Sequence, residues 1–63
     1  PEKYIETNNL LGEADNYFLQ AASHYRSGIN TRDANEIQLG GENYDAGLAT
    51  ISEAQHKLEI ITN

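Results

Sequence analysis

The chain of 63 residues contains no cysteine and a single proline, Pro1. The lack of cysteine excludes disulfides, thiolate metal sites and cysteine nucleophiles. The lack of any later proline leaves every following residue with the backbone N–H that a helix needs. A chain of this length hides only about 60 % of its unfolded surface on folding. Because disulfides are excluded, we expect a partner subunit or a metal to supply the missing stability.

Basic residues are scarce as well, with 4 Lys and Arg against 10 Asp and Glu and a formal net charge of −6. Nucleic-acid binding needs a basic stripe, and these four residues are scattered, so neither nucleic acid nor an anionic membrane surface is an expected partner. The chain has no apolar run of about 18 residues to span a membrane. The opening Pro1-Glu2-Lys3-Tyr4 lacks the pattern of a secretion signal. The sequence therefore predicts a cytoplasmic protein.

The first half of the chain has the apolar periodicity of a helix. Its inward candidates step by three and four residues from Leu11 onward, as in a heptad seam. This seam ends at Gly28, a residue type that often takes the left-handed position after a helix. Asn30 or Thr31 then offers a cap for a second helix, so a turn is predicted over residues 28–30. The inward candidates are Tyr4, Leu11, Ala14, Phe18, Ala21 and Tyr25.

The second half shows a broader stripe at the same period, typical of a helix in a globular protein. Two adjacent glycines, Gly40 and Gly41, interrupt it without changing its phase. Glycine is costly inside a helix, so this segment is either one continuous helix or two helices split at Gly40-Gly41. The inward candidates are Ala34, Ile37, Gly41, Tyr44, Leu48, Ile51 and Leu58, widened by a row at Gly47, Ala54 and Ile61.

Together the two halves predict an all-α fold, an antiparallel two-helix hairpin that forms one domain over residues 1–63. A turn centred near residue 29 pairs residues whose numbers sum to about 58. Phe18 then faces Gly40 and Gly41, so that large residues meet small ones as close packing requires. Two helices alone bury little surface, so the sequence also predicts completion of a four-helix bundle, by homodimerisation or by binding another protein.

A weaker apolar stripe on each helix lies outside the main seam and suggests the contact with that partner. On the second helix it contains Leu39, Ala46, Ala49 and Ile60. On the first helix Tyr17 is the candidate, because aromatic residues are enriched at interface hot spots. The predicted interaction residues are Leu10, Tyr17, Leu39, Ala46 and Ile60.

No motif for catalysis is present. Gly40-Gly41 is followed by Glu42, whose charge would repel a phosphate, and there is no Gly-x-Ser-x-Gly elbow. The serines lie in helical stretches or at a cap, with no triad spacing to His24 or His56. We therefore expect a protein that is not an enzyme, with no catalytic residues and no cofactor.

One pair has the spacing of metal ligands, Glu53 and His56 in a Glu-x-x-His sequence. Residues at i and i+3 share a helix face, and di-iron carboxylate bundles use this pair with a further glutamate from a neighbouring helix. In the hairpin Glu6 or Glu2 would approach Glu53, and a twofold dimer would double the ligands. Glu53 and His56 lie on the far side from the main seam, however, so two solvated side chains with Lys57 nearby are the simpler explanation.

The sequence thus favours a small, acidic, non-enzymatic protein-binding module that acts through a helical surface, as regulators, inhibitors and co-chaperones do. Two alternatives remain open at this point. One is a metal-binding bundle that uses Glu53 and His56 at a dimer interface. The other is a structural piece of a larger assembly.

Overall fold

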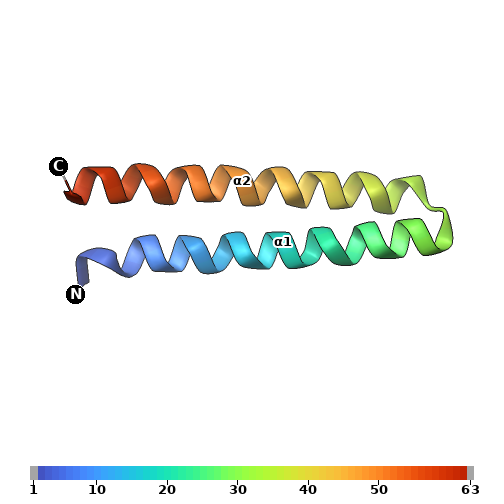
Figure 1. The fold of residues 1–63 in the computed structure, drawn as a ribbon, viewed down its shortest axis with the longest axis horizontal. Coiled ribbons are helices and arrows are strands. Elements are labelled where there is room, and N and C mark those ends of the chain that lie inside the picture. Colours follow the sequence, from blue (N-terminus) through green and yellow to red (C-terminus); the bar gives the residue numbers. More distant parts are fainter. Residues whose placement is uncertain (1, 63) are drawn as a thin grey trace.

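The computed structural model describes residues 2–62, except for the side chain of Glu2, so both ends of the predicted domain lie outside the described residues. A short 3₁₀ turn, Glu2–Tyr4, leads into helix α1, Ile5–Thr31, which is followed by helix α2, Ala34–Thr62. The two helices run antiparallel side by side, with the start of α1 and the end of α2 at one end and the turn at the other (Figure 1). The all-α hairpin predicted from the sequence is confirmed, and α2 continues through Gly40 and Gly41 without a break.

The turn lies three to four residues later than the sequence predicted, at Arg32 and Asp33. Helix α1 passes through Gly28 and ends at Thr31, and Arg32 takes the left-handed conformation with φ 55° and ψ 45°. The Asp33 N–H donates to the Gly28 carbonyl oxygen at 2.9 Å, a six-residue closure typical of helix C-termini. Asp33 then caps α2, because its Oδ1 accepts from the Asn35 N–H at 3.0 Å. The predicted caps Asn30 and Thr31 were therefore wrong; both residues still belong to α1.

A strict seven-residue repeat organises the contact between the helices. We call the position that holds large residues a and the position that holds small residues d. The other five positions of the repeat are b, c, e, f and g, in the order of the sequence. Large residues at a on one helix lie across from small residues at d on the other. On α1, position a holds Leu11, Phe18 and Tyr25, preceded by Tyr4 of the 3₁₀ turn, and position d holds Thr7, Ala14, Ala21 and Gly28. On α2, position a holds Ile37, Tyr44, Ile51 and Leu58, and position d holds Gly40, Gly47 and Ala54. The exception is Ile61, a large residue at the last d position of α2.

Three glycines show how close this contact is. A Cβ added to Gly28 would lie 2.6 Å from Ile37 Cδ1, and one added to Gly40 would lie 2.7 Å from Tyr25 Cδ1. A Cβ on Gly47 would lie 2.6 Å from Phe18 Cε1. Real Cβ atoms do not approach other carbons this closely, so each of these positions is glycine because a large side chain occupies the space. Gly28 is thus a packing residue inside α1, and not the residue that ends the helix.

These contacts give a register in which facing residue numbers sum to 65, so the predicted register was wrong by seven residues. Phe18 faces Gly47 and not Gly40 or Gly41. The error is one whole heptad, which is why the predicted pairing of large with small residues still holds. The inward stripe of α2 is also narrower than predicted, because Ala34 and Leu48 are outside the repeat of large and small residues that contacts α1. These two residues, like Gly41, are at position e, just outside the seam.

Thr7 is a polar residue within the seam. It is only 6 % exposed, and its Oγ1 has no hydrogen-bond partner among the described residues. Thr50, which is half-buried on α2, instead donates from Oγ1 to the Ala46 carbonyl oxygen at 2.8 Å. Folding removes the water that binds this hydroxyl in the unfolded chain, and no protein group replaces that water. The buried hydroxyl therefore lowers the stability of the fold.

The register predicts opposite effects for two glycine-to-alanine substitutions in helices. Gly47→Ala should lower the free energy of unfolding by about 1–3 kcal/mol, since the added methyl overlaps the Phe18 ring. Gly12→Ala should raise it by about 1 kcal/mol, because alanine is the better helix former and nothing lies within 4 Å of the new Cβ. Thermal unfolding followed by circular dichroism measures both. If Gly47→Ala stabilised the protein as much as Gly12→Ala, the register would be wrong.

The unpaired hydroxyl predicts that Thr7→Val stabilises the protein by about 1 kcal/mol, since valine has the same shape without the buried polar atom. The matched control is Thr50→Val, which should be neutral or destabilising because it removes an existing hydrogen bond. Chemical denaturation of both variants beside the parent decides the sign. Destabilisation by Thr7→Val would mean that its hydroxyl is hydrogen-bonded in the folded protein.

Candidate protein-docking surface

The tight seam divides the hairpin into two unlike faces. On a helix, positions a and e lie to one side of the small residues at d, and positions g and c lie to the other. Because the helices are antiparallel, the a and e positions of both helices point to the same side. We call this side the apolar face, and the side formed by the g and c positions the opposite face.

The large residues of the apolar face are only half covered by the hairpin itself. The buried apolar side chains among the described residues are all alanines, and no large side chain is fully buried. Five large residues at position a are exposed, namely Leu11, Ile37, Tyr44, Ile51 and Leu58. Their exposed fractions range from 37 % for Ile37 to 47 % for Tyr44. Two residues at position e, Ile29 and Leu48, add to the same surface and are 70 % and 46 % exposed.

An open apolar groove of about 300 Å³ runs along this face toward the end away from the turn. Its walls come from both helices, because Leu11 belongs to α1 and Ile51 and Leu58 belong to α2. The complete lining is Thr7, Leu11, Ile51, Ala54, Gln55 and Leu58. The groove is shallow and lacks a cluster of polar groups, so it suits apolar side chains rather than a polar small molecule.

Charged residues avoid the apolar face. Of those in α1 and α2, Asp15 alone occupies an a, d or e position. Exposed apolar surface that is continuous and bordered by polar residues marks protein or membrane interaction sites. Within residues 2–62, neither helix has an apolar stretch of the length needed to cross a bilayer.

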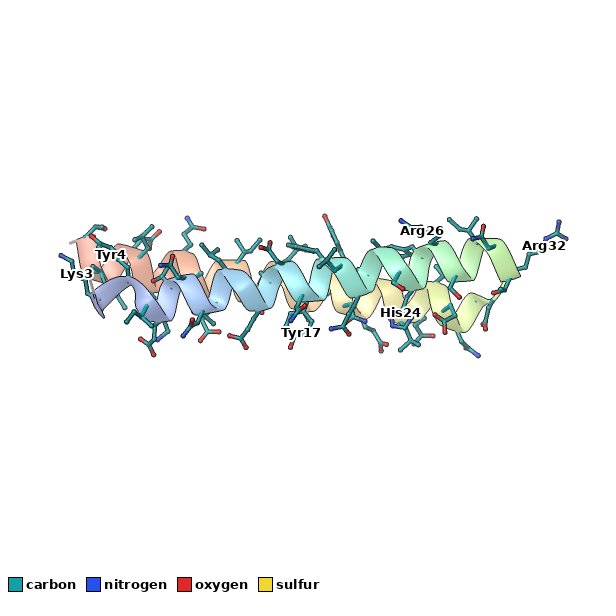
Figure 2. All side chains as sticks on the ribbon, turned by 90° about the horizontal axis from the view of Figure 1, so that it is seen from below. Lys3, Tyr4, Tyr17, His24, Arg26 and Arg32 are labelled. Atoms are coloured by element: carbon teal, nitrogen blue, oxygen red, sulfur yellow. The ribbon has the colours of Figure 1, made fainter. Side chains whose placement is uncertain are left out.

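The opposite face carries the polar contacts between the helices. His24 Nδ1 of α1 lies 2.6 Å from Glu36 Oε2 of α2, and Lys57 Nζ lies 3.6 Å from Glu6 Oε2. Tyr17 and His24 point to the same side of α1, away from Arg26 (Figure 2). The His24–Glu36 contact was not predicted from the sequence. The sign of this contact in the sequence is that His24 and Glu36 both occupy position g, beside the seam, with numbers that sum to 60. This sign can be recognised only when the register of the two helices is known.

The five predicted interaction residues all lie on the opposite face. Leu10 and Tyr17 are half-buried at position g of α1. On α2, position c places Leu39, Ala46 and Ile60 in one row, in which Leu39 is 40 % and Ile60 64 % exposed. Glu53 interrupts that row, and the flanking g positions hold Glu36 and Lys57. The structure therefore groups these residues on one face, but among charges, and their role in binding stays a prediction.

The structure does not bring further ligands to the predicted metal pair. Glu53 and His56 are both exposed on α2. Among the described residues no three His, Asp or Glu side chains come together in a way that could hold a metal ion. Glu6, the expected partner of Glu53, lies against Lys57 instead, and the side chain of Glu2 lies outside the described residues.

Comparison with known proteins adds no family to these observations. No protein-family model matches the chain. The searches of curated proteins and of solved structures found no match either.

Proposed function

We propose that the protein is a non-enzymatic protein-binding module that docks a helical surface of another protein subunit onto its apolar face. The observation that carries this proposal is the half exposure of every α2 residue at position a, from Ile37 to Leu58. In a folded protein such residues are normally covered, and covering them here requires a second layer of helices.

The energetics support the same proposal. Burial of a large apolar side chain contributes about 1.5–3 kcal/mol, but the side chains that the hairpin buries are alanines and one threonine. The large residues contribute only part of that value while one side of each remains in water. A second pair of helices over the apolar face would complete a four-helix bundle and recover the rest.

The acidic residues have a supporting role in this proposal. Within α1 and α2 all of them except Asp15 lie around the apolar face rather than on it. The net charge of −6 keeps such a surface soluble while it is uncovered. This arrangement suits a regulator, inhibitor or co-chaperone that binds through helices. No contact described above favours the metal-binding alternative.

Two leucines of α2 provide a matched test. Leu48 on the apolar face is 46 % exposed, and Leu39 on the opposite face is 40 % exposed. A photo-crosslinking amino acid is introduced at position 48 or at position 39, and cells that express either variant are irradiated. We expect a covalent adduct from position 48 and little or none from position 39, because only the first would be covered by the partner.

The mass and position of the adduct decide the outcome. An adduct from position 39 alone would place binding on the stripe predicted from the sequence and would contradict the apolar face. Equal, low yields at both positions would contradict a protein-binding role for either face. An adduct from position 48 supports the proposal whether its partner is a second copy or another protein.

A further inference from the structure

We infer that the partner is a second copy of this chain, packed apolar face to apolar face with the two turns at the same end of a four-helix bundle. This inference rests on the proposed function, because it names the occupant of the same face. Three features of the hairpin carry it: the area of the face, the placement of its charges, and the order of residues along position e.

The area of the face matches what a stable dimer needs. The hairpin measures 47 × 16 × 9 Å along its principal axes, so the flat outline of its broad side covers about 750 Å², less than the accessible surface of the same side. A standard specific interface buries about 800 Å² of each partner. An identical hairpin has the same length and width, and therefore covers the whole face without leaving either end uncovered.

The charge of the face permits a like-charged partner. Two copies at −6 each would repel one another if their charges met. Because Asp15 is the single charged residue of α1 and α2 at an a, d or e position, the other charges lie outside the contact. A foreign basic partner would find no acidic cluster on this face to pair with. The chemistry of the face is therefore that of a self-complementary apolar surface.

The order of residues at position e sets the orientation. Near the turn these residues are small or apolar, namely Ala22, Ile29, Ala34, Gly41 and Leu48. Near the other end they are Asn8, Asp15, Gln55 and Thr62. With both turns at the same end, the e positions closest in level pair like with like, as Ala22–Gly41, Ile29–Ala34 and Asn8–Gln55. The exception is Asp15, which lies closest to Leu48 of the partner subunit. With the turns at opposite ends, each apolar half would cover a polar half.

Gly41 is explained by this arrangement and not by the hairpin alone. Unlike Gly40 and Gly47, it could carry a Cβ, which would lie 3.6 Å from the Tyr25 hydroxyl and make an ordinary contact. Glycine is a poor helix former, so its presence suggests that another helix approaches closely there. In the proposed bundle α1 of one copy lies on α2 of the other. Among the e positions of the partner subunit, the same sum of 65 places Gly41 closest to Ala22, so that two small residues meet there.

Sedimentation equilibrium tests whether the partner is a second copy of the chain. We expect the parent chain to sediment at twice its 7.0 kDa. Leu48→Glu should weaken dimerisation about a hundredfold or more, because it buries an unpaired charge in the contact. Leu39→Glu adds the same charge at a similarly exposed site of α2 on the opposite face, and should leave dimerisation within about threefold of the parent. Circular dichroism confirms that each variant is helical at the concentrations used.

A parent chain that remains monomeric and helical at every concentration would overturn the inference. So would equal effects of Leu48→Glu and Leu39→Glu. In either case an adduct of another protein at position 48 would still support the proposed docking face. The experiments therefore distinguish a wrong inference about the second copy from a wrong proposal about the docking function.

Pulsed electron resonance between spin labels tests the orientation. The chain has no cysteine, so Asn30→Cys places one label per copy at an exposed site beside the turn. With the turns at the same end, the labels should lie roughly 20–30 Å apart, two to three helix diameters. A distance close to or above the 47 Å length of the hairpin would overturn the proposed arrangement.

Discussion

The structure depends on one steric constraint, that a large side chain on one helix occupies the space of a missing or minimal side chain on the other. At Gly28, Gly40 and Gly47 this space is so completely filled that even a Cβ would overlap its neighbour. The constraint repeats every seven residues along both helices, which keeps their axes close over the whole length of the hairpin. It also explains why α2 tolerates Gly40 inside a helix, where glycine is otherwise unfavourable. The packing against Tyr25 offsets the lost helix propensity.

The same repeat shows what the sequence could and could not predict about the fold. Its period identifies two helices and requires that large residues face small ones. However, a shift of one heptad pairs Phe18 with Gly40 instead of Gly47 and satisfies that rule equally well. Only the turn can distinguish the two registers, and its usual signal, a glycine, was misleading here. Gly28 is needed for packing against Ile37, whereas Arg32 takes the left-handed position despite its side chain. One residue type serves two physical purposes, so composition alone did not locate the turn.

The candidate site was partly accessible to the same reasoning. The sequence predicts that a two-helix hairpin leaves one side of its seam uncovered, and the half-exposed residues from Leu11 to Leu58 agree with this expectation. Which residues form that side depends on the register and on the angle at which each stripe meets the seam. Leu48 belongs to the inward stripe by periodicity, but it lies at position e on the exposed side. Leu39 and Ile60 of the same helix lie at position c, on the opposite face. A shift of one position around a helix is about 100°, which is enough to exchange a core residue for a surface residue.

The apolar face is finally a consequence of the tight seam itself. When the line of closest approach is filled by alanine and glycine, the large side chains cannot lie on it and must lie beside it. In this hairpin the large residues at position a of both helices lie on the same side, because the helices are antiparallel. On the other side is position g, where His24 of α1 contacts Glu36 of α2 and Leu10 and Tyr17 are half-buried. Close packing of two helices has thus moved the apolar surface from between them to one face of the pair. The second layer that we propose is therefore linked to the small residues at the seam.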